Sequence, residues 1–192
     1  MQDSGDFVLR KKIGFLGGSF DPIHLGHLNL AIQMLEQGRL DEILFCPALC
    51  SPFKTERPPV ASPEHRLAMI QLVLTPFFRV TSMELDRKGP SYTVDTLRTL
   101  SSDGNEYRLI LSDESAATFQ AWKEPAEILK LAPPIVGSRS GEKKGPFPTL
   151  KTPLFDISST QIRARLRERR YCQHLVPSIV LDYIEEFGLY LG

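Results

Sequence analysis

Two histidines stand three residues apart in a segment that opens with a glycine pair, Gly17 to His27 (GGSFDPIHLGH). An apolar run precedes the glycines and a helical pattern follows, so the segment joins a strand to a helix. Adjacent glycines let the chain turn sharply and let an anion approach the backbone. The N–H groups and the dipole at a helix start also favour an anion. His24 and His27 lie on the same side of that first turn, and Gly26 leaves the space beside them open. The segment therefore predicts a phosphate-binding turn.

Three interpretations of His24 and His27 remain open. They could be ligands of a zinc ion with Asp21 as a third ligand, or they could cap the helix without any chemistry. Alternatively, they donate to a transferring phosphoryl group and stabilise the charge that develops on it. We favour the last, because the glycines and the helix start suit an anion. The chain lacks both GxxxxGK[ST] and GxGxxG, the two commonest nucleotide-binding signatures.

A second group of polar residues opens a helix far downstream, at Ile157 to Arg163 (ISSTQIR). Hydroxyls at a helix start can hydrogen-bond phosphate oxygens, and Arg163 can neutralise phosphate charge one turn later. Taken alone, the segment fits better a plain helix cap that precedes a solvated basic face, made of Arg163, Arg165, Arg167, Arg169 and Arg170. Together with the histidine segment, it indicates a second phosphate-binding helix start.

Strand and helix patterns alternate along the chain. We expect strands at Lys11 to Leu16, Glu42 to Cys46, Phe78 to Leu85, Tyr107 to Leu111 and Pro134 to Val136. We expect helices at Leu25 to Leu35, Pro63 to Leu74, Ser91 to Leu100, within Phe155 to Arg167, and at Ser178 to Phe187. Gly137 to Thr152, rich in Gly, Pro and Lys, is predicted as a surface loop. The alternation predicts an α/β fold, a doubly wound, Rossmann-like parallel sheet with helices on both faces.

The composition predicts a soluble cytoplasmic protein that binds a small ligand. The 192 residues suffice for one core, so we expect a single domain over 1–192, with a helical part from about 157 to 192. The 23 basic residues balance the 23 acidic ones, which argues against nucleic acid as a partner. The sequence has no bilayer-spanning apolar run and no signal-peptide pattern at its start. Cys46, Cys50 and Cys172 lack CxxC spacing and are typical of free thiols in a reducing compartment.

The two motifs resemble the HxGH and ISSTxIR signatures of the nucleotidyltransferase superfamily, whose members attach AMP or CMP to a phosphorylated acceptor and release pyrophosphate. Over most of its length the chain resembles the bacterial nicotinate-nucleotide adenylyltransferases. The matching segments are GGSFDPIHLGHL, SPFK (Ser51 to Lys54), HRLAM (His65 to Met69), PSYTVDTL (Pro90 to Leu97), SDESAATFQAWKEPAEIL (Ser112 to Leu129) and ISSTQIR. The resemblance implies transfer of AMP from ATP to nicotinate mononucleotide, with Mg²⁺ bound through the ATP phosphates and no metal ligand from the protein.

The resemblance also implies which residues bind each substrate. His24, His27 and Arg163 would be catalytic. ATP would be bound by Gly17, Gly18, Ser19, Phe20, His24, Gly26, His27, Asp113, Ile157, Ser158, Ser159, Thr160 and Arg163. The acceptor would be bound by Ser19, Phe20, Lys54, Tyr92, Thr93 and Trp122. In the family the counterpart of Trp122 stacks on the pyridine ring, and main-chain groups near it and near Tyr92 and Thr93 bind the ring's carboxylate.

Two positions depart from the family pattern. Phe53 stands where the family usually has the histidine of a PPHK or PPHR loop, and Leu111 stands where it usually has a glycine two residues before the aspartate, here Asp113. These departures leave open a catalytically silent nucleotide sensor on the same fold. The HxGH signature, which phosphopantetheine adenylyltransferases share, leaves open that second enzyme. The sequence leaves the oligomeric state open.

Overall fold

The structure is a computed structural model that describes residues 10–50, 58–87, 89–138, 141, 145–153 and 155–191. Within them, one sheet has the strand order β3-β2-β1-β4-β5-β6, and all neighbouring strands are parallel. The strands are β1 (Lys12–Gly18), β2 (Glu42–Pro47), β3 (Phe78–Val80), β4 (Glu106–Ser112), β5 (Ile135–Ser138) and β6 (Thr149–Lys151). The order runs outward from β1 in one direction and from β4 in the other, which confirms the predicted doubly wound fold.

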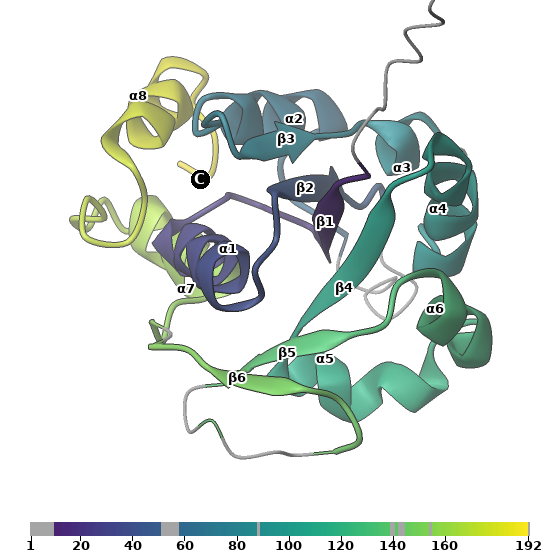
Figure 1. The fold of residues 1–192 in the computed structure, drawn as a ribbon. Helices are drawn as coiled ribbons and strands as arrows, with labels where there is room; N and C mark the ends of the chain where they lie inside the picture. Colours follow the sequence, from purple (N-terminus) through teal and green to yellow (C-terminus); the bar gives the residue numbers. More distant parts are fainter. Residues whose placement is uncertain are drawn as a thin grey trace, which may run out of the picture.

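Helices cover both faces of this sheet (Figure 1). One face carries α1 (Leu25–Gln37), α2 (Pro63–Gln71), α7 (Ser159–Arg167) and α8 (Ser178–Glu186). On the other side lie α3 (Met83–Asp86), α4 (Thr93–Leu100), α5 (Asp113–Thr118) and α6 (Pro125–Leu131), with the 3₁₀ turns η1 (Ser101–Asp103) and η2 (Phe119–Ala121). In the described residues, no helix is long and apolar enough to cross a membrane.

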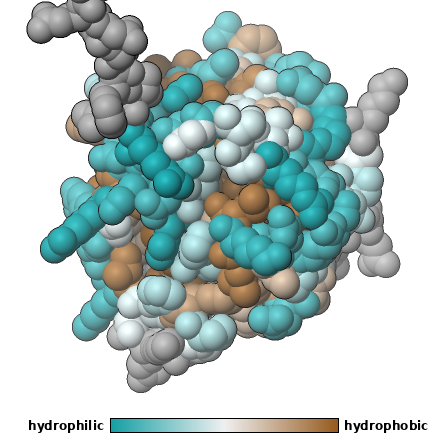
Figure 2. All heavy atoms as spheres, turned by 45° about the vertical axis from the view of Figure 1, so that its right-hand side comes forward, coloured by the Kyte–Doolittle hydropathy of each residue, from teal (hydrophilic) through white to brown (hydrophobic). Residues whose placement is uncertain are grey.

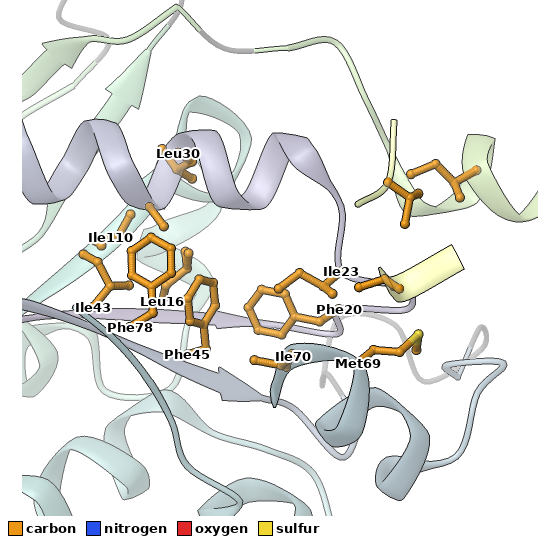
Figure 3. Packing of buried hydrophobic residues seen from close by; sticks show 14 of the residues in the cluster. Leu16, Phe20, Ile23, Leu30, Ile43, Phe45, Met69, Ile70, Phe78 and Ile110 are labelled. Carbon is orange, nitrogen blue, oxygen red and sulfur yellow. The ribbon is translucent and has the colours of Figure 1, made fainter. Parts of the chain in front are cut away.

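The sheet separates two apolar clusters, because successive side chains of a strand point to opposite faces. Leu16 of β1 packs into the first cluster with α1, α2, α7 and α8, whereas Phe15 packs into the second with α4 and α6. Figure 3 shows the first cluster. Gly14 leaves room for it, since an added Cβ would lie 2.7 Å from the Cδ1 atoms of Ile110 and Leu40.

The strand expected at Phe78 to Leu85 is wrong in its second half. Only Phe78–Val80 is strand, and Met83–Asp86 forms the short helix α3. Thr81 N still donates to Phe45 O, at 3.0 Å, a normal hydrogen-bond length. The next donor on β2 would be Pro47, which has no N–H, so pairing stops there.

The prediction of a loop over Gly137 to Thr152 is wrong at both ends. Gly137 and Ser138 belong to β5, and Thr149–Lys151 forms the edge strand β6. Main-chain bonds hold this strand, from Val136 N to Pro148 O and from Thr152 N to Ser138 O. Three half-exposed residues are too few to give a period-two signal.

Sequence reasoning missed α5 and α6 altogether. The Ser112 side chain caps α5 by accepting from Ser115 N, and Pro125 is the first residue of α6. Both are ordinary helix-start signals. Other predicted elements differ from the structure only at their ends: β1 runs through Gly17 and Gly18, and α2 ends at Gln71 rather than at Leu74.

Candidate active site

A cavity of about 400 Å³ opens beside the carboxyl ends of β1 and β4. These strands are neighbours at the point where the strand order reverses, which is where doubly wound sheets bind ligands. Figure 2 turns the α4 and α6 side toward the viewer and shows apolar surface between hydrophilic side chains. The predicted site residues among those that line the cavity are Gly17, Gly18, Ser19, Tyr92, Thr93 and Trp122. The cavity thus brings together the end of the first motif and the segments expected to bind the acceptor.

One predicted acceptor residue that the structure describes, Phe20, is not among those that line this cavity. Phe20 is 1% exposed, and its ring packs edge-on against Phe45 and His27, with centroids 5.6 and 4.9 Å away (Figure 3). The Phe20 ring therefore belongs to the core and packs beside His27. Lys54 lies outside the described residues, as does Phe53.

The start of α4 is held at the cavity by the chain that leaves β2. Ser91 N donates to Cys50 O, and the Ser91 hydroxyl accepts from Leu49 N, both at 2.9 Å. Tyr92 is the N-cap residue, and its side chain makes no cap hydrogen bond. Thr93 therefore begins a helix whose first turn faces the cavity, an arrangement that favours a carboxylate or a phosphate.

Trp122 forms a wall of the cavity beside the α4 start. It follows η2, is half-buried, and lies against Phe119 with ring centroids 5.6 Å apart. The adjacent Lys123 links this segment to α4. Its Nζ forms a salt bridge with Asp95 Oδ2 at 3.0 Å and lies 4.6 Å from the centroid of the Tyr92 ring. An aromatic wall beside a helix start suits a flat ring that carries a negative group.

The two histidines form a stacked pair at the start of α1. Their ring centroids are 3.7 Å apart, and His24 N donates to His27 Nδ1 at 3.3 Å. Because His27 Nδ1 accepts, the proton of a neutral His27 ring lies on Nε2. Gly26 is needed here, since an added Cβ would lie 3.0 Å from the Cε1 and Nδ1 atoms of His24.

His24 is a neutral imidazole in this environment. The residue is 4% exposed, and burial lowers the pKa of His24 from 6.5 to about 4. Its Nδ1 atom is buried, and no described residue hydrogen-bonds it.

Asp21 could not serve as the third ligand of a zinc site in this arrangement. Its Oδ2 accepts from Val60 N at 2.7 Å, and its Oδ1 accepts from Ala61 N at 3.0 Å and from the Tyr190 hydroxyl at 2.7 Å. Arg163 Nη1 lies 3.5 Å from Oδ2. Both carboxylate oxygens are therefore occupied, which argues against the zinc interpretation of the histidines. The capping interpretation has support, because His24 N donates to His27 Nδ1 at the start of α1.

The downstream motif packs against the turn of the first motif. Arg163 Nη1 donates to Asp21 O at 2.7 Å across 142 positions of sequence, and the Ser159 hydroxyl donates to Pro22 O at 3.1 Å. Ser158 caps α7 by accepting from Gln161 N, at 3.2 Å. The remaining motif residues lie close by: a Cβ on Gly26 would be 3.6 Å from Ile157, and Thr160 Oγ1 accepts from Arg163 Nη2 at 3.3 Å.

The alternative of a solvated basic face holds for part of this helix. Arg167, Arg169 and Arg170 are exposed, whereas Arg163 turns inward with 22% of its side chain exposed. Arg165 is also partly buried and donates from Nη2 to Tyr171 O at 2.8 Å, so Arg163 is the arginine of this face that contacts the first motif. The starts of α1 and α7 meet at the turn between Gly18 and His24, with the arginine beside them.

Asp113 is the first residue of α5 and is half-buried, at the carboxyl end of β4. Leu111, where the family pattern has glycine, is 2% exposed and packs in the second cluster while lining the cavity. The leucine thus fills space at the cavity floor and leaves the α5 start intact.

Sequence reasoning missed two buried polar residues that hold the site. Arg66 is 1% exposed and donates from Nη1 to Ser19 O and Ala48 O, each at 2.7 Å. It shares a helix face with Met69 and Ile70, and a lone arginine on an apolar face is a signal that could have revealed it.

Glu84, 4% exposed, lines the cavity and accepts from the Thr96 hydroxyl at 2.8 Å. Burial raises the pKa of the Glu84 carboxyl above its usual range.

The fold and this site define a nucleotide-binding protein of the doubly wound α/β class, with its cavity at the switch point of the sheet. A model of the cytidylyltransferase-like family matches residues 15–165. The curated relatives include proteins named "Probable nicotinate-nucleotide adenylyltransferase" from Roseiflexus sp., 43% identical over 93% of this chain and 97% of the relative, and from Thermus thermophilus, 42% identical over 93% and 99%. The chain therefore belongs to the cytidylyltransferase-like family, among the nicotinate-nucleotide adenylyltransferases, a family of nucleotidyltransferase enzymes.

Solved structures agree on the fold. The nicotinic acid mononucleotide adenylyltransferase of Plasmodium falciparum, complexed with NaAD, superposes with a TM-score of 0.76 at 19% identity and covers 94% of this chain and 98% of that chain. The same enzyme complexed with APC gives a TM-score of 0.74 at 19% identity, with the same coverage. At this identity the likeness concerns the architecture alone.

Proposed function

We propose that this protein transfers AMP from ATP to nicotinate mononucleotide and releases deamido-NAD and pyrophosphate. The observation that carries the proposal is the cavity at the switch point, which joins Gly18 and Ser19 to the start of α4 and to the Trp122 wall. An aromatic wall suits the pyridine ring, and a helix start suits its carboxylate. The names of the relatives support the same substrate pair.

ATP would occupy the neighbouring region where the starts of α1 and α7 meet. We assign it to Gly17, Gly18, Ser19, the main chain of Phe20, His24, Gly26, His27, Asp113, Ile157, Ser158, Ser159, Thr160 and Arg163. Helix starts, a stacked histidine pair and an inward-turned arginine are suited to a triphosphate. The acceptor would contact Ser19, Lys54, Tyr92, Thr93 and Trp122.

In this mechanism a 5′-phosphate oxygen of the acceptor attacks the α-phosphorus of ATP in line, and pyrophosphate leaves. The step needs no nucleophile from the protein. His24 and His27 donate hydrogen bonds to the phosphate charge that develops, and Arg163 neutralises the leaving pyrophosphate. Positioning therefore accounts for most of the chemistry.

A magnesium ion would be held mainly by the ATP phosphates. The residues around the turn fit this arrangement. Asp21 is the carboxylate of the turn, and both of its oxygens accept from protein donors, so the metal ion would take its ligands from the phosphates. Mg²⁺ usually keeps several waters and binds phosphate oxygens in such sites, where it neutralises their charge. We place the reaction in the cytoplasm, in one domain that includes residues 1–192, on the basis of the composition.

Pyrophosphate release from ATP, measured with different acceptors, tests the proposal. Nicotinate mononucleotide should be the best acceptor, and it should exceed nicotinamide mononucleotide by about tenfold or more in kcat/KM, because an amide leaves donors built for an anion unpaired. Phosphopantetheine should give no product. Turnover with phosphopantetheine alone would identify the rival enzyme, and ATP binding without turnover would identify a sensor.

A further inference from the structure

Asp21 is the point at which four separated parts of the chain meet. The residue is 2% exposed, and its carboxylate accepts from the main chain of Val60 and Ala61, from Tyr190, and pairs with Arg163. A buried carboxylate is stable only when donors compensate for its lost hydration. Each donor offsets part of the negative charge of Asp21. If one donor is removed, the carboxylate therefore attracts the remaining donors more strongly.

Among these donors, the Tyr190 hydroxyl is the farthest from Asp21 in sequence, 169 positions away. The residue follows α8 near the end of the chain and is 8% exposed. Its hydroxyl lies 2.7 Å from Asp21 Oδ1. Burial, with the Asp21 charge beside it, raises the pKa of the Tyr190 hydroxyl, so the group stays protonated and donates.

Arg163 is held by the same carboxylate at a longer distance. Its Nη1 lies 3.5 Å from Asp21 Oδ2, beyond normal hydrogen-bond length, and 2.7 Å from the main-chain oxygen of Asp21. A more negative Asp21 would attract the guanidinium more strongly. Phosphate oxygens of ATP and the Asp21 carboxylate would then compete for the same cation.

We propose that Tyr190 is a positioning residue, which donates to Asp21 and so leaves Arg163 available to the triphosphate. The inference rests on the proposed function, since it assumes that Arg163 contacts ATP. It assigns a role in substrate binding to the C-terminal segment, whose described residues do not line the cavity. The effect of Tyr190 should concern ATP and should disappear when Arg163 is absent.

Tyr190→Phe tests this by removing one hydroxyl while keeping the buried ring. Tyr183→Phe is the matched control, because the Tyr183 hydroxyl also lies in the C-terminal segment but hydrogen-bonds His65 Nδ1, at 2.9 Å. Y190F should raise the KM for ATP by about tenfold, the low end for a hydrogen bond to a charged group, and should leave the KM for the acceptor unchanged. Y183F should leave both unchanged.

The double variant R163A/Y190F separates positioning from simple destabilisation. R163A alone should raise the KM for ATP, and Y190F should add nothing further in that background. A merely structural Tyr190 would instead raise both KM values, or would act additively with R163A. Either result would overturn the proposal, as would equal effects of Y183F and Y190F.

Thermal shifts keep the test independent of turnover. ATP with Mg²⁺ should raise the unfolding temperature of Y190F less than that of the wild type, whereas the shift caused by nicotinate mononucleotide should be equal in both. If the wild type binds ATP but forms no pyrophosphate with any acceptor, the proposed function fails while this comparison still decides the role of Tyr190. Equal ATP-induced shifts in Y190F and wild type would refute that role.

Discussion

Replacing His24 should change how the stability of the protein depends on pH. Its pKa is lowered from 6.5 to about 4 by burial. Below pH 6.5 the unfolded chain takes up a proton at this position, and the folded chain does so only near pH 4. The stability of the wild type should therefore fall as the pH decreases through this window, and the contribution should level off below it.

The expected size follows from the shift. At about 1.4 kcal/mol per pKa unit, the wild type should lose about 3 kcal/mol between pH 7 and pH 4 because of His24 alone. This is a large part of the roughly 5 to 15 kcal/mol that stabilises a typical domain. The imidazole is 4% exposed, so solvent screens little of the effect.

Urea unfolding at a series of pH values measures this difference. His24→Gln removes the titrating group and should flatten the curve, so that the gap between variant and wild type changes by about 3 kcal/mol across the window. His174→Gln, which removes an exposed imidazole, controls for the loss of a histidine as such. Parallel curves for wild type and H24Q would refute the assignment of His24 as a buried neutral imidazole, and with it the view that His24 contacts phosphate without carrying a charge.

Three further substitutions test other parts of the site and core. His27→Ala should lower kcat by about 100-fold or more while the urea midpoint changes little, because a donor to developing phosphate charge is lost; near-normal turnover would exclude this role. Trp122→Ala should weaken acceptor binding by about 1 to 3 kcal/mol in calorimetry and leave ATP affinity unchanged, provided that circular dichroism shows an intact fold. Gly14→Ala should lower the free energy of unfolding by about 1 to 3 kcal/mol, since the new Cβ would lie 2.7 Å from Ile110 Cδ1; an unchanged urea midpoint would show that the neighbouring side chains move aside.

Local patterns in the sequence determined the order of elements and the position of the glycine turn between β1 and α1. The glycine pair, the histidine spacing and the Ser62 and Ser158 caps act over a few residues, so the sequence displays them directly. The alternation of strands and helices sufficed to predict a doubly wound sheet. Prediction failed where the local signal was weak. The second half of the strand expected at Phe78 to Leu85 is the helix α3, because Pro47 ends the pairing of β2 with β3. The strand β6 was missed because main-chain bonds to β5 hold it.

Only the tertiary structure decided which of these segments meet. The strand order places the ends of β1 and β4 side by side, so the first motif, the α4 start and Trp122 share one cavity. The same packing turns Phe20 into the core and gathers Arg163 and Tyr190 around Asp21. These contacts join residues more than a hundred positions apart, and no local periodicity encodes them. They form because a buried carboxylate must find its donors wherever the folded chain provides them.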